Sequence, residues 1–267
     1  MPLPPRWTTP RRLLRLPVLA LLGASLLACA PAPSAGRGSE AGSTASATGG
    51  VRAAFSDDGV AWVSGGRACV ARVPSFQPSC PRLAPASDVG WQQSGGQGAD
   101  AWAALPGPGL VVTLDRAPRS LNVGAVVLLS STRIYREDGS ALTYSGEAGR
   151  GVAGAPLAAV TGGDGRDYVV LGRELRRVDD GAVLDRAAQP FLYATPSGAA
   201  SAALPTASDG LSLYRLTGST LERFSAGQVV ARVPHGPGQV GLVRGEVVTV
   251  DAAGRVRRFT PQLAQLN

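Results

Sequence analysis

From Val51 onward, short apolar runs alternate with clusters of glycine, aspartate, serine and proline. The apolar runs are rich in valine, leucine, tyrosine and threonine, and no long stretch keeps the spacing of about 3.6 residues that an amphipathic helix shows. Short alternating runs bounded by turn residues are typical of β-strands. The pattern therefore predicts an all-β domain over residues 51–267.

The predicted strands recur in six segments with one outline: an apolar strand, a tight turn, a second strand, a glycine-containing turn and a third strand. The segments cover residues 59–83, 100–123, 125–145, 167–187, 211–233 and 239–260. Trp62 and Trp102 occupy the same place in the first two segments. Asp138-Gly139 and Asp180-Gly181 are expected in matching second turns, because tight hairpins need residues with positive φ.

Three-strand units that recur about every 40 residues indicate the blades of a β-propeller. Two intervals are shorter, so either those blades lack a strand or the segments are out of register. The units resemble quinoprotein-like and WD-like propeller repeats, although none carries the Gly-His and Trp-Asp pairs of WD repeats. We expect a propeller of about six degenerate blades with three to four strands each. A β-sandwich is the alternative, but its connections would not need to repeat.

Residues 1–28 show a different pattern, in which basic residues and an apolar stretch occur without any acidic residue. The basic residues are Arg6, Arg11, Arg12 and Arg15. The apolar stretch, about 13–27, is shorter than the roughly 20 residues that a membrane-spanning helix needs, so it predicts a cleaved signal peptide. Arg11-Arg12 leaves export by the twin-arginine route open.

The end of this segment, Leu26-Leu27-Ala28-Cys29, resembles the lipobox of bacterial lipoproteins. The resemblance covers the first 29 residues and implies cleavage after Ala28, a diacylglycerol on the Cys29 sulfur and a fatty acid such as palmitate on the new N-terminus. Several acyl chains anchor a protein firmly. We therefore expect a lipoprotein of the bacterial cell envelope that faces the periplasm or the exterior. A plain secretory signal with a chance cysteine is the alternative.

Residues 29–50 connect this expected anchor to the β domain. Residues 30–50 contain no large apolar side chain, so they cannot bury enough surface to offset the entropy of ordering them. We expect a flexible tether with an end-to-end distance of roughly 25 Å.

Cleavage would also change the charge and cysteine content. It removes four arginines and no acid from a chain of formal net charge +7, leaving +3. This weakens the case for a nucleic-acid partner, which needs a clustered basic face. Once Cys29 carries lipid, Cys69 and Cys80 remain, and an even pair in an oxidising compartment predicts a disulfide bond.

Candidate catalytic and metal-binding residues are few. The single histidine, His235, is expected in a solvated loop, and its solitude excludes sites built on several histidines. Asp164 and Asp167 lie in a stretch that resembles the calcium loop of integrin-type propeller repeats. Hard cations need several oxygen ligands and only these two positions match, so an ordinary polar turn is favoured over a metal site.

The remaining candidates also favour structural roles. Three acidic pairs could provide acid–base chemistry, but each lies where a turn is expected: Asp57-Asp58, Glu137-Asp138 and Asp179-Asp180. Trp62, Trp91 and Trp102 could line a binding surface, but strand aromatics usually pack in a core.

Together, these features predict a monomeric, lipid-anchored propeller that binds or scaffolds an envelope protein or glycan. No cofactor is expected. The sequence favours this non-catalytic role over an enzyme. The alternative is an envelope-sugar hydrolase or lyase with carboxylates at the central channel.

Overall fold

The structure, a computed structural model, describes residues 50–92, 98–115 and 117–266. The expected signal peptide (1–28), Cys29 and all of the tether except Gly50 lie outside the described residues. In the described part of the chain every regular element is a β-strand, and the first begins at Val51. Within those residues no helix is long and apolar enough to cross a membrane.

The described residues form 26 strands in seven antiparallel sheets, six of four strands and one of two. The first three sheets are β1 (Val51–Ser56), β2 (Gly59–Ser64), β3 (Arg67–Arg72) and β4 (Pro78–Ser79); β5 (Asp88–Gln92), β6 (Asp100–Leu105), β7 (Leu110–Thr113) and β8 (Ser120–Asn122); and β9 (Val126–Leu129), β10 (Ile134–Arg136), β11 (Ala141–Leu142) and β12 (Ala148–Gly149). The fourth sheet is β13 (Ala158–Thr161), β14 (Asp167–Leu171), β15 (Glu174–Arg177) and β16 (Val183–Asp185), and the fifth is the hairpin β17 (Phe191–Thr195) and β18 (Gly198–Ala202). The last two are β19 (Thr206–Ser208), β20 (Ser212–Leu216), β21 (Thr220–Ser225) and β22 (Gln228–Pro234); and β23 (Gly238–Val243), β24 (Glu246–Asp251), β25 (Val256–Phe259) and β26 (Gln265–Leu266).

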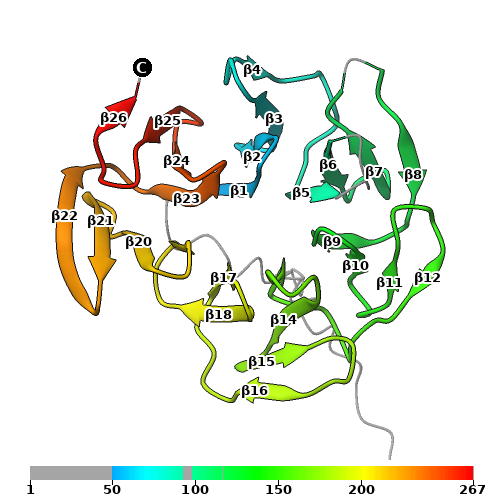
Figure 1. Ribbon diagram of the computed structural model, residues 1–267. Helices are drawn as coiled ribbons and strands as arrows, with labels where there is room; N and C mark the ends of the chain where they lie inside the picture. Colours follow the sequence, from blue (N-terminus) through cyan, green and yellow to red (C-terminus); the bar gives the residue numbers. More distant parts are fainter. Residues whose placement is uncertain (1–49, 93–97, 116, 267) are drawn as a thin grey trace, which may run out of the picture. The chain divides into compact units, whose positions relative to one another are not determined.

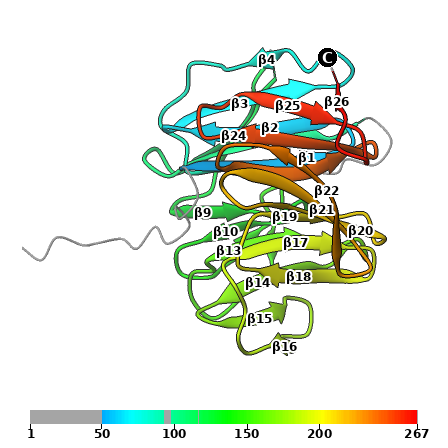
Figure 2. The same ribbon diagram turned by 90° about the vertical axis from the view of Figure 1, so that its left-hand side faces the viewer.

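The sheets are arranged in a ring around a common axis (Figure 1). In each sheet the strands run outward in sequence order, and the innermost strands β1, β5, β9, β13, β17, β19 and β23 contact one another around the ring. The innermost strands β1 and β17 run along the axis (Figure 2). The predicted β-propeller with six degenerate blades is confirmed, and the β-sandwich is wrong. The two-stranded fifth sheet, which the sequence did not predict, is a seventh sheet in the ring beside the six four-stranded blades.

The register of the predicted repeats was wrong in four of the six segments. Segments 59–83, 100–123, 167–187 and 211–233 begin at or next to β2, β6, β14 and β20, the second strands of their sheets, whereas 125–145 and 239–260 begin at innermost strands. This mixture of registers, and not the loss of strands, produces the two short intervals. The missed inner strands include Ala-Ala-Val-Thr in β13 and Thr-Ala-Ser in β19, which are too short and too weakly apolar to stand out.

The shift in register also affects the two Asp-Gly turns. Asp138-Gly139 lies between β10 and β11, in the second turn of its sheet, but Asp180-Gly181 lies between β15 and β16, in the third. The two turns are therefore not in matching places. Both glycines do have positive φ, 83° and 73°, as the turn chemistry requires.

Apolar side chains from neighbouring sheets form the core. Five clusters of buried residues fill the junctions between sheets one and two, two and three, three and four, six and seven, and seven and one. The clusters at the other two junctions, on either side of the β17–β18 hairpin, are absent among the described residues. The hairpin therefore interrupts an otherwise continuous ring of packed sheets.

Sheets one and seven close the ring through packing and a few hydrogen bonds. Val60 and Trp62 of β2 share a buried cluster with Val248 of β24. The Arg244 backbone N–H donates to Asp57 Oδ1 at 3.0 Å, and the Ser64 hydroxyl donates to the Ala252 carbonyl at 3.1 Å. No strand is shared between the two sheets, so closure depends on these side-chain contacts.

Cys69 of β3 and Cys80, directly after β4, have their Sγ atoms 2.07 Å apart, at bonding distance. The pairing predicted from the cysteine count is therefore compatible with the fold. The pair joins the third and fourth strands of the first sheet, one strand further out than the repeat register implied. It ties the short, exposed β4 to the core of its sheet.

Candidate functional site

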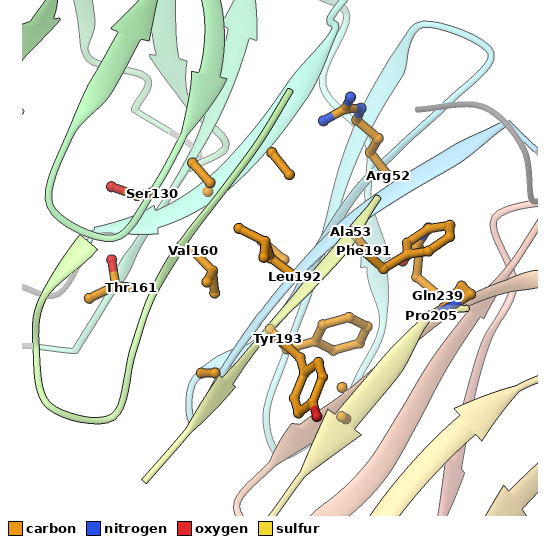
Figure 3. Close-up of a pocket in the computed structure, with 18 of the residues that line it drawn as sticks. Arg52, Ala53, Ser130, Val160, Thr161, Phe191, Leu192, Tyr193, Pro205 and Gln239 are labelled. Carbon is orange, nitrogen blue, oxygen red and sulfur yellow. The ribbon is translucent and has the colours of Figure 1, made fainter. Parts of the chain in front are cut away.

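A cavity of about 370 Å³ lies at the centre of the ring (Figure 3). All seven innermost strands contribute to its wall. These strands contain many small residues, such as the alanines of β1 and β13, because side chains from seven strands converge there. The small side chains that made these strands hard to detect in the sequence also leave this space open.

One side of the cavity is aromatic and apolar. Phe191, Leu192 and Tyr193 of β17 lie along the wall (Figure 3). Phe55 of β1 also lines the cavity. The sequence analysis did not identify these residues. The run Phe191–Thr195, followed by Pro196 and Ser197, is a strand-and-turn signal that could have revealed the hairpin.

The polar part of the wall contains hydroxyl groups, one amide and one ion pair. Ser131 and Thr161 contribute hydroxyls, and Gln239 donates from Nε2 to the Val51 carbonyl at 3.1 Å. Pockets of this kind, apolar with a few placed polar groups, are typical ligand sites. The lining thus suits a neutral or amphipathic group.

Arg52 and Asp88 form the ion pair, with 3.6 Å between Nη1 and Oδ1. Asp88 also accepts a hydrogen bond from the Leu129 N–H at 2.9 Å. Burial raises the pKa of the Asp88 carboxyl, and Arg52 opposes this shift. Asp88 is the only carboxylate among the described residues that line the cavity. A pair of carboxylates for glycosidic chemistry is therefore not present among them.

Asp167, one of the two weak metal candidates, is fully buried between sheets three and four. Its Oδ1 accepts from the Thr161 hydroxyl at 2.6 Å, and its Oδ2 accepts from Tyr135 OH at 2.9 Å. Oδ2 also accepts from the hydroxyls of Ser130 and Thr132, and Arg133 Nη1 lies 3.1 Å away. Burial and the neighbouring Asp167 charge raise the pKa of the Tyr135 phenol, which therefore remains a donor. The carboxylate is satisfied by protein donors and joins two sheets.

Asp164, the other candidate, lies in the turn before β14. Its Oδ2 accepts from Tyr168 OH at 2.6 Å, and its Oδ1 accepts from the Arg166 N–H at 3.2 Å. The hydrogen bond from Tyr168 lowers the pKa of the Asp164 carboxyl. The described residues contain no group of three or more side chains that could hold a metal ion. Asp164 therefore lies in the polar turn that the sequence favoured, whereas Asp167 is the buried first residue of β14.

His235 is buried, with 3% of its surface exposed, so the expectation of a solvated loop histidine was wrong. Nδ1 lies 2.7 Å from the Gly236 carbonyl, and Nε2 lies 2.7 Å from Thr249 Oγ1. A carbonyl only accepts, so Nδ1 carries the proton and Nε2 accepts from Thr249. Burial lowers the pKa of the imidazole. The neutral ring therefore connects the end of β22 to β24.

The acidic pairs and the tryptophans have the structural roles that the sequence favoured. Asp57-Asp58, Glu137-Asp138 and Asp179-Asp180 all lie in turns. The three tryptophans Trp62, Trp91 and Trp102 are buried in the clusters between sheets. Trp91 also lines the central cavity, and Glu137 and Asp138 line a second, more open pocket beside Arg136.

No family model and no curated protein sequence matches this chain. Among solved structures, the chain is similar to PorZ, a bacterial surface component of the type-IX secretion system of Porphyromonas gingivalis. Identity is 11%, the alignment covers 82% of this chain and 37% of PorZ, and the TM-score is 0.54. It is also similar to a streptogramin B lyase (12% identity, 82% of each chain, TM-score 0.41) and to the WD40 propeller domain of Doa1 (12% identity, 77% of this chain and 76% of that one, TM-score 0.41). At these identities the likeness to PorZ shows the propeller fold alone.

Proposed function

We propose that this protein is a monomeric, non-catalytic binding or scaffolding propeller, anchored outside the cytoplasmic membrane of a bacterium by lipid on Cys29. The lipobox residues Leu26–Cys29 support the anchor. The position of Cys69 beside Cys80 supports an oxidising compartment, because disulfide bonds persist there. The partner is an envelope protein or glycan.

The observation that carries the binding role is the composition of the central cavity. Phe191 and Tyr193 offer aromatic surface, and the Arg52 side chain, 30% exposed, offers hydrogen-bond donors in the wall of the same cavity. A ligand group with an apolar or ring face and a polar or anionic edge could contact the aromatic side chains and Arg52 at the same time. A cavity of about 370 Å³ has the size of small-ligand sites. The partner therefore inserts such a group at one mouth of the ring.

The residues that line the cavity give less support to the alternative function as an enzyme. A hydrolase or lyase acting on sugars uses two carboxylates near the scissile bond. Asp88 has a buried carboxyl group engaged by Arg52 and by Leu129 N–H, and the described lining offers no second carboxylate. We therefore favour binding over catalysis.

Photo-crosslinking in living cells tests this proposal. A benzophenone amino acid replaces Tyr193 inside the cavity or, as the matched control, Ser79 on the exposed outer strand β4. We expect a discrete adduct with an envelope component from position 193 and not from position 79. Equal adducts at both positions, or none from position 193, would refute binding in the cavity.

A further inference from the structure

The two-stranded fifth sheet leaves a recess in the side of the ring. Sheets four and six, on either side of it, each have four strands, whereas β17–β18 has two. Neighbouring strands lie about 4.8 Å apart, so β18 is set back from the outer strands beside it by roughly 10 Å. The hairpin lies between these larger sheets in Figure 1.

The outer edge of β18 lacks a strand partner among the described residues. Thr195 pairs with Gly198 across a two-residue turn, Tyr193 pairs with Ala200, and Ala199 faces Ala194. Hydrogen-bonded and non-bonded pairs alternate in antiparallel sheets, and the pair that flanks a two-residue turn is hydrogen-bonded. Ala199 therefore directs its N–H and C=O away from β17, toward the recess.

Among the described residues, the exposed large apolar side chains belong to the two sheets that flank this recess or to residues next to their strands. The six large ones in the described residues are Leu157, Leu184, Leu211, Leu213, Val229 and Val230. Leu211 is 89% exposed, and Val230 is 53% exposed. Leu157 lines the central cavity, whereas Leu213 and Val229 lie in one row on sheet six, and neighbouring exposed apolar residues of this kind mark interaction sites.

The strand register shows which face of sheet six is uncovered. Leu213 pairs with Phe224, and Phe224 pairs with Val229, so these three side chains form one row. Tyr214 and Leu216 point to the opposite face, where they pack on sheet seven. The row therefore lies on the face of sheet six that is turned toward the β17–β18 hairpin. The two strands of the hairpin are too few to cover this face.

This face also carries an excess of positive charge. Glu222 is shared by Arg215 and Arg232, each 3.0 Å away. The carboxylate is nearly buried, but the two arginine side chains are 40% and 59% exposed. Two guanidinium groups against one carboxylate leave one positive charge, which an acidic side chain would complement.

We propose that an extended segment of a partner protein adds to β18 as a third strand, with its aliphatic and acidic residues at every second position, because residues two apart share the face that meets sheet six. Its backbone pairs with Ala199, its aliphatic side chains cover Leu213 and Val229, and its acidic side chains approach Arg215 and Arg232. Strand addition to an open edge is a general mode of peptide recognition. A second copy of the chain fits less well, because its own β18 is equally recessed, whereas a single extended segment can enter.

Selection of random 12-residue peptides displayed on phage, with the purified full chain as bait, tests this proposal. Enriched peptides should carry both aliphatic and acidic residues at every second position, on one face of the strand. Ala199→Pro, which removes the outward N–H, should weaken their binding about tenfold, the loss expected for roughly one hydrogen bond. Binding should also slow hydrogen exchange at Ala199.

The matched control is Ala148→Pro on the edge strand β12. Ala148 pairs with Leu142, next to the hydrogen bond from Thr143 N–H to the Glu147 carbonyl, so its own N–H also points outward. This variant should bind the peptides like the wild type. No enrichment, equal binding to Ala199→Pro, or self-association that Ala199→Pro abolishes would each overturn the proposal. The recess lies outside the central cavity, so this result is independent of crosslinking at position 193.

Discussion

Gly241 of β23 lies directly against the ring of Phe55 in β1. A Cβ atom at Gly241 would be 2.1 Å from Phe55 Cγ, closer than any real contact. These residues belong to the seventh and first sheets, and they meet where the ring closes. The closure therefore depends on a position that accepts no side chain.

Gly241→Ala should lower the free energy of unfolding by about 1–3 kcal/mol, the usual cost of overpacking a core. Urea unfolding measures the effect. Gly107→Ala is the control, because a Cβ there has no neighbour within 4 Å. Combining Gly241→Ala with Phe55→Ala should cost less than the sum of the two single changes, since the clash is removed. Strict additivity would contradict the contact.

The disulfide should stabilise the first sheet. Cys69 and Cys80 are separated by 11 positions, and closing a loop of this size is worth about 2–3 kcal/mol in the chain-entropy model. A reductant should therefore lower the melting temperature of the wild type. The double variant Cys69→Ala/Cys80→Ala should melt at a lower temperature than the oxidised wild type, and the reductant should not change its melting temperature. Free thiols detected by alkylation of the folded, unreduced protein would show that no bond forms.

The sequence predicted the outer parts of the propeller better than the inner ones. Second strands such as β2 and β6 are mostly apolar because both faces are buried between sheets, and they stand out in the sequence. Inner strands such as β19 are three residues long and carry small side chains. The hairpin β17–β18 was missed for the same reason, since β18 reads Gly-Ala-Ala-Ser-Ala.

The candidate site could not be predicted from the sequence, because its residues belong to strands that are far apart along the chain. Phe191, Tyr193 and Arg52 line the same cavity only because the ring places β17 and β1 around one axis. His235 appeared solvated because Pro and Gly surround it, but Thr249 from a distant strand covers it. Contacts between residues far apart in sequence depend on the order of sheets around the ring, which the misplaced register obscured.

His235 should make stability depend on pH. Burial lowers the pKa of its imidazole in the folded state below the unfolded value of about 6.5, so the unfolded state binds more protons just below that pH. The free energy of unfolding should therefore fall as the pH drops through the unfolded pKa toward the folded one. His235→Gln should lose this component. Urea unfolding at about pH 7.5 and about pH 5.5, compared between the two proteins, isolates it from the carboxylates. The same pH dependence in both would exclude His235 as its source.

Asp167→Asn should destabilise the junction of sheets three and four by about 3–5 kcal/mol. The substitution leaves Arg133 without its buried partner and places an amide among hydroxyl donors. Asp164→Asn, in the turn before β14, is the control and should cost less than about 1 kcal/mol. Calcium should leave the melting temperature of the wild type unchanged, because the Asp167 oxygens already accept from protein groups. Stabilisation by calcium that Asp167→Asn removes would instead identify a metal site.

Cys29→Ala should release the protein from the membrane. Leu26-Leu27-Ala28-Cys29 resembles a lipobox, and under the proposed function acyl chains on Cys29 would provide the anchoring energy, about 0.8 kcal/mol for each buried methylene. Cells fed an alkyne analogue of palmitate should label the wild type and not Cys29→Ala. The variant Cys69→Ala/Cys80→Ala retains Cys29 and is the control, so it should label like the wild type. Label that persists in Cys29→Ala would place the acyl group elsewhere. Loss of label together with unchanged membrane retention would show that something other than lipid holds the propeller there.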